Sequence, residues 1–378
     1  MRIAILSLHY NPITGAGLHQ VLKMFLVFFA SAGHQTTLFT ALSDNNVLPR
    51  DKAYTVIEKH LGGSFLQTQK NVAKLLLAEE NNFDIYFICG PALLWAGGMY
   101  RKHGGKNPTV VFVNNYTSAM WRISLKGREG SILFHIKKYL WEKTVGLSLT
   151  KYLDAFIYDS PIIGKLYEQF GYPKSKSKLL SEPIELQNNA LNPNKGKVNS
   201  RFKALFVGRL IKEKGVDILL RAMLLLRDNK EIQLDIVGDG PGKEWILKFI
   251  KTNNLSETVT LHPWQTRDAL STFYKNADTF IHPCRWIEPF GRTIVEAMDF
   301  GLPIITTSDT GASWAMGKGG LSFKNGNEKE LAEKIKILQK NTELKFSLSK
   351  EAKLRAKEFD YKKTLPVFLD FIEKLAKG

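Results

Sequence analysis

Cysteine is nearly absent from this sequence, which has only Cys89 and Cys284 among 378 residues. Two widely separated cysteines make no disulfide framework, and such scarcity suits a reducing compartment. The longest apolar stretch, residues 22–32, is interrupted by Lys23 and is too short to span a bilayer. The N-terminal apolar run stops at His9, too early for a signal peptide. We therefore expect a cytoplasmic protein.

Several common catalytic motifs are also absent, and acidic residues are fewer than basic ones. The sequence contains no His-Glu-x-x-His, Cys-x-x-Cys or Gly-x-Ser-x-Gly motif and no internal repeat. Its 36 acidic residues are outnumbered by 53 lysines and arginines, which gives a net charge of +17. This balance favours anionic partners, namely nucleotide phosphates, acidic lipid headgroups or nucleic acid.

Length and pattern predict two α/β domains. A chain of 378 residues exceeds one typical core. Short apolar runs alternate with helical spacing, which predicts doubly wound, Rossmann-like domains with parallel sheets. Residues 183–202, rich in Asn, Pro and Lys, lose periodicity and are predicted to be a linker. The predicted domains are residues 1–182 and 203–360. The predicted strands are residues 3–8, 36–39, 84–89, 109–113, 155–158, 203–207, 234–237, 258–261, 280–281 and 303–307.

The stretch 280–301 carries the strongest functional signal. An apolar strand is followed by a turn and by a helix predicted over residues 292–299, with Glu288 before the helix and Glu296 inside it. The neighbours of Glu296 are apolar, so its carboxylate needs hydrogen-bonding partners, and ligand hydroxyls would serve. Backbone N–H groups at the helix start favour electron-rich ligand atoms.

Glu288-Pro289-Phe290-Gly291 with Glu296 resembles the E-x7-E element of family-four retaining glycosyltransferases, which use nucleotide sugars and have the GT-B fold. The similarity runs from residue 202 to about residue 333, and a weaker one covers residues 1–42. It implies two Rossmann-like domains facing a cleft, with the donor bound to the C-terminal domain. It also implies that the last helix, residues 361–378, crosses back to the N-terminal domain.

The resemblance gives roles to individual residues. Glu288 and the backbone N–H groups of Phe290 and Gly291 would hold the donor sugar, and Glu296 would accept from ribose hydroxyls. Arg209 and Lys214 follow a predicted strand in a glycine-containing loop before a helix, a setting suited to pyrophosphate. The family uses Arg and Lys at these positions on the donor phosphates.

Trp264 follows another predicted strand, where relatives place the nucleobase, and the sequence leaves open whether it stacks on a base or packs in the core.

The N-terminal half departs from the family pattern. Gly15 matches the first glycine of a pair in the loop after the first strand, but Ala16 replaces the second. A ligand-free turn stays an open alternative there. Asn114 and Asn115 stand where the family often has His-Asp, and an amide can bind a sugar hydroxyl but cannot relay a proton as imidazole does.

Residues 121–143 combine six basic residues with four aromatic ones. Such a helix suits contact with an anionic membrane surface, which would make the protein peripheral at the inner face of the membrane. The alternative is an amphipathic helix that packs its aromatic side chains on the N-terminal domain. Both interpretations are compatible.

The sequence thus predicts a retaining glycosyltransferase that moves a sugar from a nucleoside-diphosphate sugar to a glycan, lipid-linked or small-molecule acceptor. No Asp-x-Asp occurs, so we expect neither a metal nor another cofactor. A nucleotide-sugar epimerase and a binding protein that lost transfer activity are the alternatives. A nucleic-acid binder rests on charge alone, and we expect no nucleic-acid partner.

Overall fold

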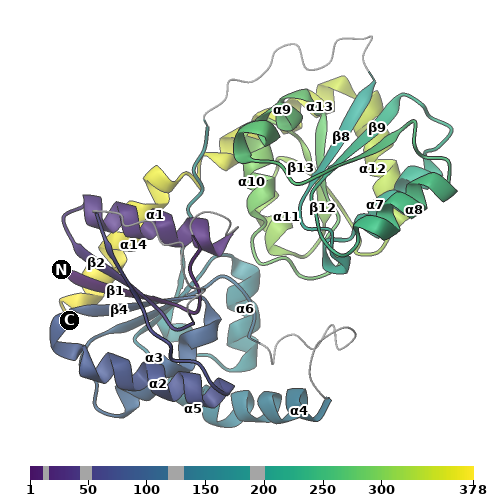
Figure 1. The fold of residues 1–378 in the computed structure, drawn as a ribbon. Helices are drawn as coiled ribbons and strands as arrows, with labels where there is room; N and C mark the ends of the chain where they lie inside the picture. The colour runs from purple at the N-terminus through teal and green to yellow at the C-terminus, as the bar shows by residue number, and fades with distance from the viewer. Residues whose placement is uncertain (12–16, 43–52, 118–131, 188–200) are drawn as a thin grey trace. The chain divides into compact units, whose positions relative to one another are not determined.

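The protein is described from a computed structural model, with residues 12–16, 43–52, 118–131 and 188–200 left out of the description. The chain divides into two compact units (Figure 1). Unit 1 comprises residues 1–183 and 361–378, and unit 2 comprises residues 184–360. The cleft between two domains stays a prediction, and most of the predicted linker lies outside the described residues.

Unit 1 is built on a seven-stranded sheet in the order β3-β2-β1-β4-β5-β6-β7. Its strand pairs are all parallel. The strands are β1 (Arg2–Ser7), β2 (Gln35–Thr40), β3 (Thr55–Glu58), β4 (Ile85–Cys89), β5 (Thr109–Val113), β6 (Ala155–Tyr158) and β7 (Ser177–Leu179). The helices are α1 (Leu18–Ser31), α2 (Phe65–Ala78), α3 (Leu94–Lys102), α4 (Ile132–Trp141), α5 (Leu147–Thr150), α6 (Pro161–Phe170) and α14 (Tyr361–Ala376).

The central strands of unit 1 form because they are continuous apolar runs. Every residue of β4 and β5 is buried. This is expected of a parallel sheet whose two faces are both covered by helices. Two separate apolar clusters, one containing the side chains of α1 and the other those of α3, pack in unit 1.

The last helix of the chain belongs to unit 1 although it follows unit 2 in the sequence. Figure 1 shows α14 in yellow beside the purple α1. Phe368 of α14 is fully buried and meets Phe25 and Phe112 edge to face, with ring centroids 4.9 and 5.5 Å apart. The predicted return of the C-terminal helix is therefore confirmed.

Unit 2 repeats the architecture with a six-stranded parallel sheet in the order β10-β9-β8-β11-β12-β13. The predicted fold class of two Rossmann-like domains is confirmed. The strands are β8 (Phe202–Val207), β9 (Ile232–Val237), β10 (Val259–His262), β11 (Thr279–His282), β12 (Ile304–Thr307) and β13 (Gly320–Phe323). The helices are α7 (Val216–Leu225), α8 (Lys243–Thr252), α9 (Arg267–Asn276), α10 (Arg292–Asp299), α11 (Gly311–Met316), α12 (Glu328–Lys340) and α13 (Thr342–Ala356).

The structure adds three strands that the sequence pattern did not predict, β3, β7 and β13. All three lie at sheet edges. Most of their residues are exposed or half-buried, so they lack the apolar run that marks an inner strand.

The described part of the basic segment 121–143 is helical, as predicted. It begins with α4 and continues as a π-helical turn, Glu142–Gly146, while residues 118–131 lie outside the described residues. Among the described residues, no helix is long and apolar enough to cross a membrane. Short 3₁₀ turns complete the secondary structure at η1 (Glu80–Asn82), η2 (Pro91–Leu93), η4 (Lys174–Lys176) and η5 (Lys212–Lys214).

Candidate functional site

The candidate site lies in unit 2, where the loops after β8 and β11 meet. Strand β8 pairs with β9 on one side and with β11 on the other, so the strand order reverses between β8 and β11. In open parallel sheets, ligands bind outside the carboxyl ends of the strands at such a switch point.

Glycines allow these loops to touch backbone to backbone. A Cβ atom on Gly215 would lie 1.8 Å from the carbonyl oxygen of Pro283, and one on Gly311 would lie 1.6 Å from that of Pro289. Gly215 also has a φ of +70°, which other residues rarely adopt. No side chain would fit at either position, so the loops can approach closely enough to bring Lys214 beside Glu288.

Lys214 and Glu288 form a buried ion pair. The Lys214 Nζ lies 2.8 Å from Glu288 Oε2, and the two side chains are only 14% and 11% exposed. The sequence predicted both residues as site residues but assigned them to different parts of the donor. The structure brings them into direct contact.

Three further side chains converge on the same carboxylate oxygen. Trp286 Nε1 donates to Glu288 Oε2 at 2.7 Å. Cys284 Sγ lies 3.1 Å from Oε2, and His282 Nε2 lies 3.5 Å from it. Sequence reasoning missed these three residues. The local pattern gave no signal that singled them out, because the chain bends after β11 and these residue types also occur in ordinary cores.

The charges of the pair are stabilised mutually. Burial opposes ionisation of Glu288, yet Lys214 and His282 hold its pKa well below the usual range. Burial likewise works against the ammonium of Lys214, but the Glu288 carboxylate raises its pKa, while the nearby Arg209 guanidinium opposes this. Arg209 and Lys214 both lie in the segment between β8 and α7.

His282, Cys284 and Glu288 offer ligand atoms that all lie within 4.8 Å of one another, the one such group among the described residues. The arrangement fits a divalent cation poorly. The Lys214 ammonium already lies against the carboxylate oxygen that would bind the ion. The His282 Nδ1 is buried without a described partner, whereas metal-binding histidines normally donate from their second nitrogen.

The other predicted residues of this region take different positions. Arg209 follows β8 and is exposed, with its guanidinium free to meet an anion. Phe290 is 2% exposed and packs edge to face on Phe359, so only its backbone faces the site loop. Gly291 has a φ of +91° and caps α10. Trp264 is 66% exposed, so the core alternative is wrong for this residue.

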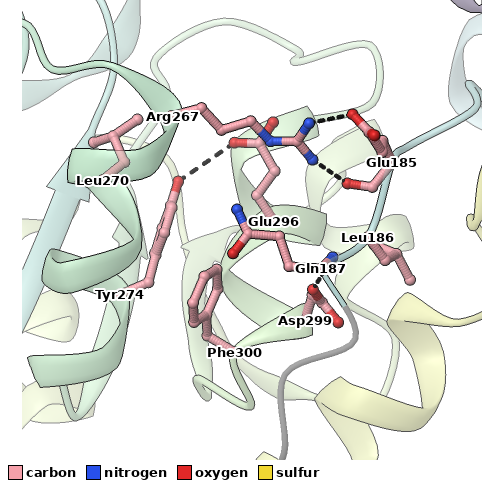
Figure 2. A pocket seen from close by; sticks show the side chains of 9 residues that line it. All are labelled: Glu185, Leu186, Gln187, Arg267, Leu270, Tyr274, Glu296, Asp299 and Phe300. Carbon is pink, nitrogen blue, oxygen red and sulfur yellow. Dashed lines mark hydrogen bonds and ion pairs between the residues drawn. The ribbon is translucent and has the colours of Figure 1, made fainter.

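Glu296 lines a pocket formed by α9, α10 and the segment 185–187 (Figure 2). Its Oε2 lies 3.4 Å from the hydroxyl of Tyr274, and Arg267 pairs with Glu185 across the same pocket. Burial raises the pKa of Glu296, against the pull of Arg292 and Arg267. Tyr274 and Arg267 were not predicted from the sequence. The pocket is further lined by Leu186, Gln187, Leu270, Asp299 and Phe300.

Two predicted site residues belong to unit 1. Asn114 follows β5, and its amide donates to Glu182 Oε1 at 3.2 Å. Glu182, which accepts this hydrogen bond, is buried, with 5% of its surface exposed. Gly15 lies outside the described residues, and its predicted role stays a prediction.

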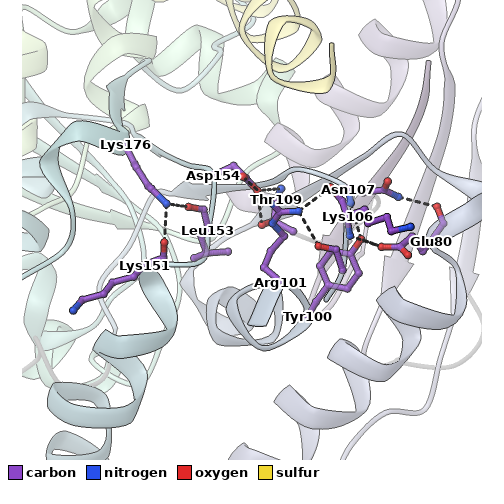
Figure 3. Close-up of polar contacts among 11 residues, drawn as sticks. Glu80, Tyr100, Arg101, Lys106, Asn107, Thr109, Lys151, Leu153, Asp154 and Lys176 are labelled. Atoms are coloured by element: carbon purple, nitrogen blue, oxygen red, sulfur yellow. Dashed lines mark hydrogen bonds and ion pairs between the residues drawn. The ribbon is translucent and has the colours of Figure 1, made fainter. Parts of the chain in front are cut away.

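A second charged cluster lies at the amino edge of the unit 1 sheet (Figure 3). Asp154 accepts from the backbone N–H of Thr109 at 2.7 Å and from Arg101 at 3.1 Å. The hydroxyl of Tyr100 donates to Glu80 at 2.6 Å. These bonds join α3 and the starts of β5 and β6, away from the carboxyl edge where ligands bind. We assign this cluster to the stability of unit 1.

Comparison with known proteins finds a family whose members resemble unit 2. Residues 188–355 match the family described as "Glycosyl transferases group 1". A relative named alpha-monoglucosyldiacylglycerol synthase, from Acholeplasma laidlawii, is 32% identical over 209 residues. That alignment covers 53% of this chain and 51% of the relative, about half of its length. Over this part of its sequence, the chain is similar to the group 1 glycosyl transferases.

Two solved structures share the fold over nearly the whole chain. Sucrose-phosphate synthase from Thermosynechococcus elongatus superposes with a TM-score of 0.83 at 17% identity and covers 99% of this chain and 98% of that one. The Anabaena protein HepE in complex with UDP gives 0.79 at 18% identity, covering 99% and 100%. The predicted GT-B fold is therefore confirmed.

The two glutamates should affect stability in opposite directions. The pKa of Glu288 is lowered on folding, so its contribution is fully present above the unfolded pKa of about 4.3 and is lost gradually as pH falls from there through the much lower folded pKa. Glu288→Gln leaves Lys214 without its counter-charge and should lower the free energy of unfolding at pH 7 by about 3 kcal/mol. Glu296, whose pKa is raised, costs stability at neutral pH, so Glu296→Gln should raise it.

Urea denaturation of both variants and the parent between pH 7 and pH 3 measures these effects. The deficit of Glu288→Gln should shrink as the pH falls, because the parent loses the same contribution. Glu333→Gln is the control, since this acid of α12 is exposed and lies outside the site. Equal effects of Glu288→Gln at pH 7 and pH 3 would contradict the assigned charge of the buried pair.

Proposed function

We propose that this protein is a retaining glycosyltransferase that moves a sugar from a nucleoside-diphosphate sugar to a hydroxyl group of an acceptor, without a metal ion. The observation that carries the proposal is the buried Lys214–Glu288 pair at the switch point of a group 1 glycosyl transferase unit. An exposed arginine, Arg209, lies in the same loop region.

The cations of this loop suit the leaving group. When the bond between sugar and diphosphate breaks, negative charge grows on the phosphate oxygens. Arg209 offers a planar fork and Lys214 a compact charge, and both are held by the loop that follows β8. Fixed positive charge at the place where negative charge develops lowers the barrier without a divalent cation.

The two glutamates would bind different parts of the donor. Glu288, beside Lys214, would accept from hydroxyls of the donor sugar, and the backbone N–H groups of Phe290 and Gly291 would add donors at the start of α10. Glu296 lies about one turn into the helix, in the pocket with Tyr274, and would accept from the ribose. We assign no covalent nucleophile. The leaving phosphate would take the proton of the acceptor hydroxyl on the same face of the sugar.

The acceptor is a glycan, a lipid-linked saccharide or a small molecule that approaches from unit 1. The relative from Acholeplasma laidlawii is named for a diacylglycerol product, which favours a lipid acceptor within this range. Asn114 would contribute a hydrogen bond to a substrate hydroxyl. Closure of the units would exclude water and suppress donor hydrolysis.

A transfer assay with UDP- and GDP-sugar panels and mixed acceptors tests the proposal. Activity should persist in EDTA, because protein cations replace the metal. Full and reversible dependence on Mg²⁺ or Mn²⁺ would overturn the charge argument. Conversion of the donor without any acceptor product would favour an epimerase, and binding without turnover would favour a protein that has lost transfer activity.

Binding and turnover should separate the roles of the site residues. Glu296→Ala removes a charge-assisted hydrogen bond that is present before and during reaction, so nucleoside-diphosphate affinity should fall about tenfold to a hundredfold. Arg209→Ala and Lys214→Ala should reduce turnover more than ground-state affinity, since they meet charge that grows in the transition state. Glu288→Gln should spare nucleotide affinity and cripple transfer.

Calorimetric titration with the nucleoside diphosphate, beside steady-state kinetics, gives both quantities. Lys248→Ala in α8 is the matched control for Arg209→Ala, because it removes an exposed cation elsewhere in unit 2. The assigned roles would be reversed if Glu288→Gln lost nucleotide affinity while Glu296→Ala kept it.

We further propose that the α4 region of unit 1 contacts an anionic membrane surface. Trp141 packs edge to face on Phe65, as the packing interpretation of this helix requires. The α4 region nevertheless exposes three apolar side chains, Ile136, Leu140 and Val145, whose exposed fractions are 50%, 56% and 47%. Ile136 and Leu140 are one turn apart in α4, and Val145 lies in the π-helical turn that follows.

Basic side chains flank this apolar stripe, and Lys137 is exposed beside it. Apolar insertion together with attraction to acidic headgroups is the usual basis of interfacial binding. A membrane contact would bring the protein to the surface that carries lipid-linked acceptors.

Vesicle co-sedimentation tests this contact. Binding to vesicles rich in acidic lipid should weaken as salt rises, because exposed charges are screened. Neutralising Arg122, Lys126, Arg128, Lys137 and Lys138 together, or changing both Ile136 and Leu140 to Ser, should release the protein. Leu225→Ser, at a residue of unit 2 that is 50% exposed, should have no effect. Absent or salt-insensitive binding would contradict the proposal.

A further inference from the structure

The two carboxylate oxygens of Glu288 have different surroundings. Oε2 lies within 3.5 Å of Lys214, Trp286, Cys284 and His282. Oε1 has no hydrogen-bond partner among the described residues, and it is not sealed from solvent, because the side chain stays 11% exposed. One oxygen is therefore held by the protein, and the other is left for a ligand.

We propose that His282, Cys284 and Trp286 are positioning residues that fix Glu288 through Oε2, so that Oε1 is the single oxygen which receives a hydroxyl of the donor sugar. This inference rests on the proposed function and adds three residues to it. None of the three needs to touch the donor.

The contacts define a directed chain of donors. The Cys284 thiol lies between its neighbours, 2.9 Å from His282 Nε2 and 3.1 Å from Glu288 Oε2. A carboxylate can only accept, so the thiol donates its proton to Glu288. The histidine then donates its Nε2–H to sulfur, which leaves Nδ1 as the nitrogen without a proton. That nitrogen is buried without a described partner.

The protonation states agree with this direction. Burial lowers the pKa of His282 and keeps the ring neutral at pH 7, despite the opposing pull of Glu288. Burial raises the pKa of Cys284 well above its usual value, against the influence of Lys214, so the thiol keeps its proton. The other titratable groups that bear on Glu288 are Lys214, whose ammonium touches it, and Arg209, which acts on Lys214.

Crowding on Oε2 has a consequence for the substrate. A carboxylate oxygen offers about two lone-pair positions, and the ammonium of Lys214 and the indole N–H of Trp286 already lie within 2.8 Å of Oε2. The thiol lies at longer range and completes the shell. An incoming hydroxyl therefore finds only Oε1 open. Loss of any donor would loosen the carboxylate and make it easier to protonate.

Cys284→Ala and Trp286→Phe test the proposal, because each removes one donor and keeps most of the side-chain volume. For each variant, kcat/KM should fall about threefold to tenfold. The acidic limb of the kcat/KM profile should move upward by about half to one pH unit. Affinity for the nucleoside diphosphate alone should change less than twofold, whereas the extra affinity that the donor sugar provides should shrink.

A hydroxyl donor should restore the profile, so Cys284→Ser should lie closer to the parent than Cys284→Ala does. Thr306→Val is the matched structural control. The Thr306 hydroxyl donates to the backbone oxygen of His282 at 3.0 Å, so its loss disturbs the same strand without touching Glu288. This variant should lose stability but keep the acidic limb and the affinity contribution of the sugar.

The possible outcomes distinguish failure of the proposed function from failure of the positioning role alone. A parent protein that neither transfers nor binds donor sugars would overturn the proposed function itself. An active parent whose Cys284→Ala and Trp286→Phe variants keep the acidic limb and the sugar contribution would overturn the positioning role alone. A shift in Thr306→Val equal to that in Cys284→Ala would also overturn it, because the effect would then be structural.

Discussion

The buried ion pair of Lys214 and Glu288 is the interaction on which the site of unit 2 depends. Two charges removed from water are costly, and their mutual attraction compensates only when the geometry is close and the remaining bonding capacity is used. The 2.8 Å separation meets the first condition, and the donors from Trp286 and Cys284 meet the second. A hydrophobic pair of the same volume would serve stability as well. Stability alone therefore does not account for the charges of this pair, whereas the proposed binding of a donor sugar does.

Close backbone contact between loops is the condition for that pair. Gly215 and Gly311 stand where any Cβ atom would overlap a carbonyl oxygen of the loop that carries Glu288. The sheet supplies the frame, because β8 and β11 are neighbours at the point where the strand order reverses. The glycines then let the two connecting loops close on each other. Neither condition is sufficient without the other, since a bulky residue at position 215 would separate the cation from the carboxylate.

The inner strands were predictable because continuous apolar runs occur only where helices cover both faces of a sheet. The edge strands β3, β7 and β13 were not, because their stability comes from pairing with a neighbour that the local sequence does not reveal. In the site, Glu288 and Glu296 could be predicted as site residues because both are acids in an apolar stretch. Their neighbours His282 and Cys284 could not be predicted, because a buried histidine and a buried cysteine are also ordinary core residues. The exposure of Trp264 in the structure excluded a core position for this residue, and the sequence does not report exposure.

The path of the chain gives unit 2 two connections to unit 1, and they lie side by side. The chain enters unit 2 at residue 184 and leaves it at residue 360. Ile184 and Asp360 form a parallel bridge, and the backbone N–H of Ile184 donates to Phe359 at 2.9 Å. Phe368 then holds α14 in unit 1, where it packs on Phe25 and Phe112. The last helix of the chain thus completes the core of the unit in which the chain began, and the fold of unit 1 depends on both ends of the sequence.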